Sequence, residues 1–144
     1  MKLVLTCLFA VCCCFMASTS ANILQRKKLQ EVLRQLSAVK ANLQHNEQML
    51  NTPPKNIEDC CCLSALHCFR TTLQVQFNIT ERNRSKLYRS LNHNITEKGL
   101  DFCNSGNVRP TCQDCDSHPK ENASEFFNRL ESLIQRAIDR LSMN

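Results

Sequence analysis

Two short stretches of this sequence concentrate its sulfur. "DCCCLSALHCF", residues 59–69, holds four cysteines in nine positions, and "TCQDCDS", residues 111–117, holds two more. Thiols in such patterns can form disulfides, bind a metal, or carry redox and nucleophilic chemistry. The spacing and the surrounding residues decide among these chemistries.

Redox, metal and catalytic interpretations of these cysteines lack essential parts. The CQDC sequence at Cys112 and Cys115 has redox-dithiol spacing, but the strand-and-helix context that such a site needs is absent. Zinc could use this pair with His67 or His118, but a second ligand pair at finger spacing is missing. His67 and Cys68 are adjacent and point to different helix faces, which disfavours a catalytic pair. We therefore expect structural disulfides, no enzymatic activity, no cofactor and no metal.

The first 21 residues predict a signal peptide. "MKLVLTCLFAVCCCFMASTSA" opens with Lys2, continues with an apolar run shorter than a bilayer span, and closes with small residues up to Ala21. The mature chain is then one domain, residues 22–144. Cleavage after Ala21 would leave seven of the eleven cysteines in the mature chain. The four that lie in the signal peptide are Cys7, Cys12, Cys13 and Cys14. We expect a secreted, extracellular protein whose cysteines meet an oxidising compartment.

Charge and composition exclude one class of partner and leave the chain mildly basic. The formal net charge is +5, aromatic residues make up 6% and tryptophan is absent. Nucleic-acid binding needs a denser basic stripe with interleaved aromatic residues, so we expect no nucleic-acid partner. We also expect no membrane insertion, and a monomer.

Apolar residues recur at helical spacing in four segments. Residues 23–48, 59–76, 81–93 and 123–142 are predicted helices, the third with a thin apolar stripe and the last with a wide one. Asp59 suits the start of the second helix, and Ser124 is the predicted cap of the last. Strand periodicity is not seen.

The connections between these segments favour one topology. The second and third helices are about five residues apart, which makes them antiparallel neighbours, whereas residues 94–120 are predicted to form a long loop. The first connection, roughly ten residues at about 3.3 Å each, can run back along a helix. We predict an all-α fold: a short-chain, disulfide-stapled four-helix bundle with up-up-down-down topology.

The spacing of the cysteines fits a pair of bridges. On a helix, Cys61 and Cys68 lie on one face about 10.5 Å apart, and Cys112 and Cys115 span about 10 Å in extended chain. The two pairs match if the long loop runs extended beside the second helix. A third bridge would join Cys103 to either Cys60 or Cys62, and one of the seven thiols is left over.

Four sequons mark candidate surface positions for N-linked glycans. They begin at Asn78, Asn83, Asn94 and Asn122. Three of them bracket the predicted third helix, so glycans there would leave a binding partner another face of that helix.

The combined motifs resemble the interleukin-21 family, within the short-chain cytokines that use the common gamma receptor chain. The shared elements are "CCLSALHCF" (61–69), "CQDCDS", "EFFNRLESLIQ" (125–135) and a first helix similar around "LQEVLRQL". These elements occur in matching order and at matching separations along the predicted mature chain. "LQVQ" (73–76) is instead similar to interleukin-15, so a cytokine like interleukin-15 or interleukin-2 is the alternative.

The resemblance implies a disulfide pairing and two receptor faces. It pairs Cys61 with Cys112 and Cys68 with Cys115, and it implies an immune-cell cytokine that bridges a private receptor chain and the common gamma chain. The matching positions are Gln135 and Ile138 for the common gamma chain, and Lys27, Lys28, Glu31 and Gln35 for the private receptor. On pattern alone, Ile138 fits a core position equally well, and Lys27 and Glu31 fit a solvated face.

The sequence departs from the family in places, and another class of protein shares its general character. Arg34 stands where familiar members carry an acid, and Cys60, Cys62 and Cys103 are additional. A saposin-like lipid-binding protein is also small, secreted and disulfide-rich. Its cysteines should bracket the terminal helices, but here none follows Cys115.

Overall fold

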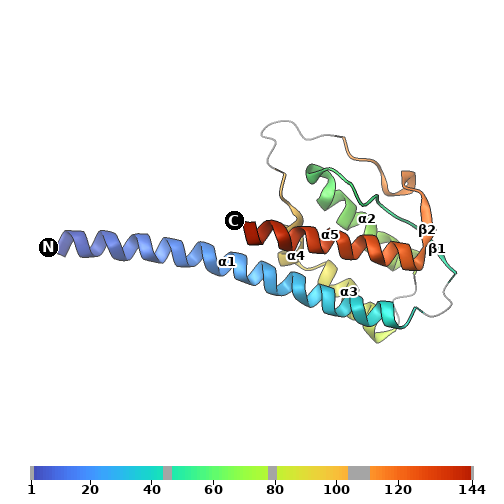
Figure 1. Cartoon of the computed structure of the whole chain (residues 1–144), viewed down its shortest axis with the longest axis horizontal. Helices are drawn as coiled ribbons and strands as arrows, with labels where there is room; N and C mark the ends of the chain where they lie inside the picture. Colours follow the sequence, from blue (N-terminus) through green and yellow to red (C-terminus); the bar gives the residue numbers. More distant parts are fainter. Residues whose placement is uncertain (1, 44–46, 78–80, 104–110, 144) are drawn as a thin grey trace.

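The computed structural model describes residues 2–43, 47–77, 81–103 and 111–143, with side chains from residue 20 to residue 142 in those ranges. Its α-helices are α1 (Lys2–Ala41), α2 (Cys62–Val75), α3 (Arg82–Leu91), α4 (Asn94–Leu100) and α5 (Ala123–Met143). Two 3₁₀ helices, η1 (Asp59–Cys61) and η2 (Cys115–Ser117), and two strands, β1 (Met49–Asn51) and β2 (Lys120–Asn122), complete the described part. The fold is mostly helical, which confirms the all-α prediction (Figure 1).

The first helix packs one apolar stripe into the core and extends well beyond it. Leu29, Val32, Leu36 and Val39 are at most 2% exposed, at the spacing that the sequence indicates. Figure 1 shows the N-terminal part of α1 projecting past the other helices. This part includes the predicted signal peptide, whose cleavage stays a prediction. None of the described helices combines enough length and hydropathy to cross a bilayer.

The helix ends at Ala41, seven residues before the predicted end. Asn42 donates its side-chain amide to the Ala38 carbonyl at 3.2 Å, and its backbone N–H bonds Val39 instead of continuing the regular ladder. Carbonyls at a helix C-terminus lack intrahelical partners, so such bonds favour termination. The chain then leads towards β1.

Aromatic side chains join α2 to α5 at the centre of the core. Phe69 contacts Phe126 edge to face, with ring centroids 5.1 Å apart, and Phe126 contacts Phe127 at 5.0 Å. Phe127 meets Phe77 in the same manner at 5.3 Å. Because each ring is at most 1% exposed, this cluster adds directional contacts to a large buried area. The predicted helices 59–76 and 123–142 are confirmed within one to three residues at each end.

The prediction of four helices omitted α4, which lies in the predicted loop 94–120. His93 caps it through Nδ1, which accepts from the Ile95 N–H at 3.2 Å, and Thr96 donates to the Ser90 carbonyl at 2.6 Å. Gly99 lies in the segment that the sequence predicts to be a loop. In the structure a Cβ there would lie 3.0 Å from the Leu29 Cδ1, so glycine permits the close approach of α4 to α1.

A two-stranded sheet, which the sequence did not predict, joins two distant connections. β1 and β2 pair antiparallel with Met49 opposite Asn122 and Asn51 opposite Lys120. The Thr52 N–H extends the contact by donating to the Pro119 carbonyl at 3.0 Å. The segment that leaves α1 is thereby bound to the segment that enters α5. Figure 1 shows α5 running back along α1 from this sheet.

Candidate functional site

Three disulfides attach η1 and α2 to the connection between α4 and α5. Cys61 is bonded to Cys112 and Cys68 to Cys115, with Cα atoms 5.6 and 5.1 Å apart. This is the pairing that the resemblance implies. The cross-links close loops of 51 and 47 residues, and the chain-entropy relation gives each about 4 kcal/mol when considered alone. They fix the segment that holds Cys112 and Cys115, which precedes α5, to η1 and α2.

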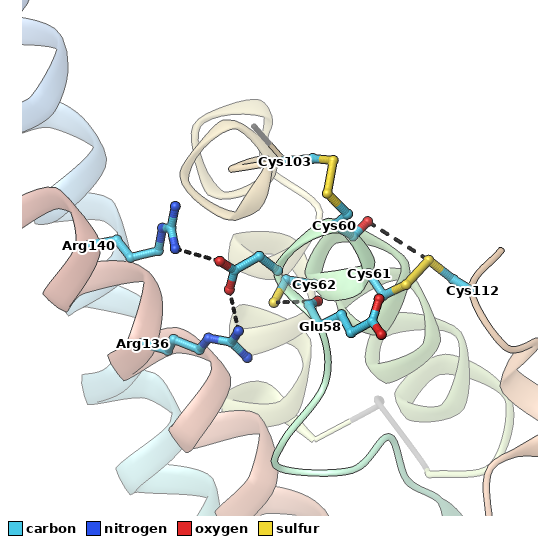
Figure 2. Close-up of a disulfide and its surroundings, with 9 residues drawn as sticks. Glu58, Cys60, Cys61, Cys62, Cys103, Cys112, Arg136 and Arg140 are labelled. Atoms are coloured by element: carbon cyan, nitrogen blue, oxygen red, sulfur yellow. Dashed lines mark hydrogen bonds and ion pairs between the residues drawn. A yellow bond between two sulfur atoms is a disulfide. The ribbon is translucent and has the colours of Figure 1, made fainter. Parts of the chain in front are cut away.

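The third bridge joins Cys60 to Cys103, which resolves the choice that the sequence left open. Their Cα atoms are 4.3 Å apart (Figure 2). Cys62, the other candidate, starts α2 and is fully buried in the core, where its Sγ lies 3.5 Å from the Glu58 carbonyl oxygen. Burial raises the pKa of the Cys62 thiol above its ordinary value. Among the cysteines whose side chains the structure describes, Cys62 is the free one, and its burial disfavours an intermolecular disulfide.

These bonds also remove the alternative uses of sulfur. Cys112 and Cys115 are bonded to different cysteines on α2 and η1, so they are neither a dithiol pair nor thiolate ligands. Within the described residues, no three His, Cys, Asp or Glu side chains are grouped as a metal site.

A charged cluster beside the disulfides fixes α5 against η1. Asp59 accepts hydrogen bonds from Arg136 and from Arg140, the latter at 2.8 Å (Figure 2). Arg136 also donates to the Ile57 carbonyl at 2.7 Å, and the Arg140 guanidinium lies 4.4 Å from the centroid of the Phe102 ring. The sequence placed Asp59 only at a helix start. The one feature of the sequence that indicates a shared partner is local: Arg136 and Arg140 are four residues apart and lie on the same face of α5.

The residues predicted on the first helix share one face and border a groove. Lys27 is exposed, while Lys28 and Gln35 are half-buried on either side of Glu31. Lys28 Nζ lies 3.5 Å from Glu31 Oε2, and Gln35 Nε2 donates to Glu31 Oε1 at 3.3 Å. The structure therefore joins Lys28, Glu31 and Gln35 in one polar network, with Lys27 beside it on the same groove.

The opposite side of this groove comes from α3 and the start of α4. We name it the α1–α3 groove, and its lining residues are Leu24, Lys27, Lys28, Gln30, Glu31, Arg34, Gln35, Lys86, Arg89, Ser90, His93 and Ile95. Sequence analysis did not identify Lys86 or Arg89, because the apolar stripe of α3 does not reveal which neighbour its polar face adjoins.

The residues predicted on the last helix have different surroundings. Gln135 is exposed and donates to Asp139 Oδ1 at 3.0 Å, whereas Ile138 is 7% exposed and belongs to the core. Gln135 lies in a second hollow, the α5 groove, lined by Glu131, Ser132, Gln135, Arg136, Asp139 and Arg140. Contact of Ile138 with a receptor stays a prediction, and its small exposed area limits any such contact.

Three of the four sequons lie within the described chain. Asn94 and Asn122 are exposed, Asn83 is half-buried on α3, and Asn78 lies outside the described residues. Glycosylation of each stays a prediction.

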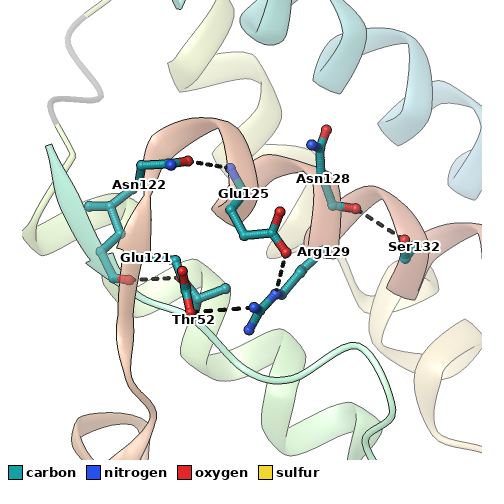
Figure 3. Close-up of polar contacts among 8 residues, drawn as sticks. Thr52, Glu121, Asn122, Glu125, Asn128, Arg129 and Ser132 are labelled. Carbon is teal, nitrogen blue, oxygen red and sulfur yellow. Dashed lines mark hydrogen bonds and ion pairs between the residues drawn. The ribbon is translucent and has the colours of Figure 1, made fainter. Parts of the chain in front are cut away.

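Asn122 has a structural role that the sequence analysis gave to Ser124. The Asn122 Oδ1 accepts from the Glu125 N–H at 2.8 Å and caps α5 (Figure 3). Ser124 is exposed and lies two residues after the capping position, inside the first turn of α5. Arg129 strengthens the same turn by donating to Glu125 at 2.7 Å and pairing with Glu121 at 3.4 Å.

Comparison of the chain with models of known protein families finds no match. The fold and the two grooves define a disulfide-stapled helical protein that offers separate polar surfaces. No catalytic constellation is found among its described residues, and the arrangement suits binding.

Proposed function

We propose that this chain is a secreted cytokine of the interleukin-21 type. In this proposal it signals to immune cells by bringing together a private receptor chain and the common gamma chain. A cytokine like interleukin-15 or interleukin-2 is the alternative. The motifs around Cys61, Cys112 and Glu125 and their order support the group, and the sequences CDS (115–117) and SLIQ (132–135) favour the first identity.

The helix directions support an up-up-down-down bundle made of α1, α2, α3 and α5. In Figure 1, α1 and α2 run in the same general direction, and α3 and α5 run back. In this interpretation of the topology, α4 belongs to the long connection that precedes α5. Such topology is that of growth-hormone and cytokine bundles.

Secretion is supported by two independent features. Three disulfides are typical of proteins that fold in an oxidising compartment. The first 21 residues have the composition of a signal peptide.

One observation carries the bridging mechanism: the α1–α3 groove and the α5 groove have no lining residue in common. Packing of α1 against α5 in one core, with an ion pair between Lys40 and Glu131 at 2.9 Å, holds these surfaces at a fixed separation. A ligand with two such faces can gather two receptors, because engagement of the first raises the effective concentration of the second. No catalysis is required.

Binding to receptor ectodomains, singly and in pairs, tests this function. Lys27→Glu with Lys28→Glu should abolish binding to the private receptor and leave binding to the common gamma chain. Gln135→Lys with Asp139→Lys should do the reverse. Either pair should abolish receptor phosphorylation in cells that carry both chains.

A control pair carries the same charge reversal away from both grooves. Lys55 and Lys120 are exposed and line neither groove, so Lys55→Glu with Lys120→Glu should preserve both interactions. Failure of the unaltered protein to bind either ectodomain would refute the proposal. Tighter binding to the private chains of interleukin-15 than to that of interleukin-21 would establish the alternative.

A further inference from the structure

The α1–α3 groove carries more positive charge than a single pair of complementary side chains would need. α1 contributes Lys27, Lys28 and Arg34, and α3 contributes Lys86 and Arg89. Glu31 is the one carboxylate among the lining residues, and it already accepts from Lys28 and Gln35.

The cations are arranged along the groove on both of its sides. Lys27 and Arg34 are seven residues apart on α1, which places them on one face about 10.5 Å apart. Lys86 and Arg89 are one turn apart on α3, and all four of these side chains are exposed. Lys28 lies in both parts of the hollow and connects them. Two parallel rows of cations favour an extended anion over a compact one.

We propose that the α1–α3 groove binds a linear sulfated polysaccharide of the cell surface or extracellular matrix. Such a chain carries closely spaced fixed anions that can follow both rows of cations. The inference goes beyond the proposed function: it shares with it the α1–α3 groove and the extracellular location, which the disulfides favour on their own. A single-stranded nucleic acid would lack its usual stacking platform, because no Phe, Tyr or Trp is among the residues that line the groove.

One sequon lies beside the groove. His93 and Ile95 line the groove and flank Asn94, which is exposed at the start of α4. A glycan on Asn94 would stand at that end of the groove. We therefore expect polysaccharide binding to be at least as tight after enzymatic removal of N-linked glycans.

The experiment measures the affinity of the purified mature protein for size-defined heparin fragments at about 0.15 M salt, where exposed charges are partly screened. Lys86→Glu with Arg89→Glu, and separately Lys27→Glu with Arg34→Glu, should each weaken binding by about tenfold or more, because each removes several ionic contacts. Lys55→Glu with Lys120→Glu changes the net charge equally and should weaken binding by less than about threefold. A milder pair, Lys86→Gln with Arg89→Gln, should give an intermediate loss. Circular dichroism of each variant checks that the fold is kept.

Three results would overturn this inference. Equal losses in the groove pairs and the control pair would show that only net charge matters. Undiminished binding of chemically desulfated heparin would show that the groove does not recognise sulfate groups. Tighter binding of a single-stranded oligonucleotide than of heparin would point to a different polyanion.

The receptor-binding measurements and the heparin-binding measurements are independent tests. Heparin binding needs no receptor, so its loss in the groove variants supports the polysaccharide site even if no ectodomain binds. If both partners bind, heparin fragments should compete with the private receptor for the α1–α3 groove and leave the common gamma chain unaffected.

Discussion

Asp59 and Arg136 are 77 positions apart in the chain and form an ion pair that ties η1 to α5. Arg140 completes the cluster, and the Cys60–Cys103 disulfide lies beside it in Figure 2. The contact matters because η1 carries two of the bonded cysteines, Cys60 and Cys61, and α5 carries one of the two proposed binding surfaces.

Asp59→Asn should destabilise the fold by about 1 kcal/mol, because it removes the charge from a partly exposed network of two ion pairs. The difference from the unaltered protein should shrink in about 1 M salt, where the charges are screened. Chemical unfolding followed by circular dichroism measures both effects. Asp116→Asn, at an exposed carboxylate, is the control, and an equal loss there would contradict the importance of the Asp59 contact.

Asn122 combines two roles that substitutions can separate. Asn122→Ala should cost about 1 kcal/mol of stability through loss of the α5 cap, and it should also remove any glycan. Asn122→Asp should keep the cap and remove the glycan. Ser124→Ala should also remove only the glycan, since Ser124 does not cap the helix. Mass spectrometry and thermal unfolding of the three variants test this separation, and similar destabilisation by all three would contradict it.

Cys62 should be protected from alkylation in the folded mature protein. Its side chain is fully buried and its raised pKa leaves little thiolate at neutral pH. Iodoacetamide should therefore add nothing in native buffer and one group per chain in denaturant without reductant. Cys62→Ser should abolish the labelling in denaturant. Rapid labelling in native buffer would show that the thiol is accessible.

Stability should fall when the pH decreases from about 7.5 to 5.5. Burial lowers the pKa of His118 below its ordinary value of 6.5, so in this window the unfolded chain binds more protons than the folded one. Acidification therefore favours unfolding. The pKa of His67 is also lowered, mainly by desolvation and secondly by the charge of Arg70. Protonation of His67 at lower pH therefore also favours the unfolded chain.

Urea unfolding at the two pH values measures this dependence. His118→Gln should reduce the pH effect without abolishing it, because His67 remains. A greater stability at pH 5.5 than at pH 7.5 would reverse the expected sign.

Ile138→Asp should lower stability by several kcal/mol, because it would place a carboxylate in the core without a partner. Gln135→Asp alters an exposed position and should leave thermal unfolding within about 0.5 kcal/mol of the unaltered protein. Calorimetry of both variants tests the assignment. Gln135, and not Ile138, is therefore the residue with which to examine the α5 groove by substitution.

Part of the candidate site could be read directly from the sequence. Lys27, Lys28, Glu31 and Gln35 share a face because residues three, four and seven apart on a helix do so, whatever the tertiary structure. Lys86 and Arg89 were not identified, because their role depends on α3 lying against that face.

The sequence by itself determined the helices α2, α3 and α5, their apolar faces, and the spacing that lets two pairs of cysteines match. These properties are local, since helical rise and periodicity act over a few residues. Only the tertiary structure decided that Cys60 and not Cys62 meets Cys103, that Asp59 meets Arg136, that Ile138 is in the core, and that β1 pairs with β2. Each of these depends on which distant segments lie side by side, and three-residue strands or adjacent cysteines carry no local pattern that distinguishes the partners.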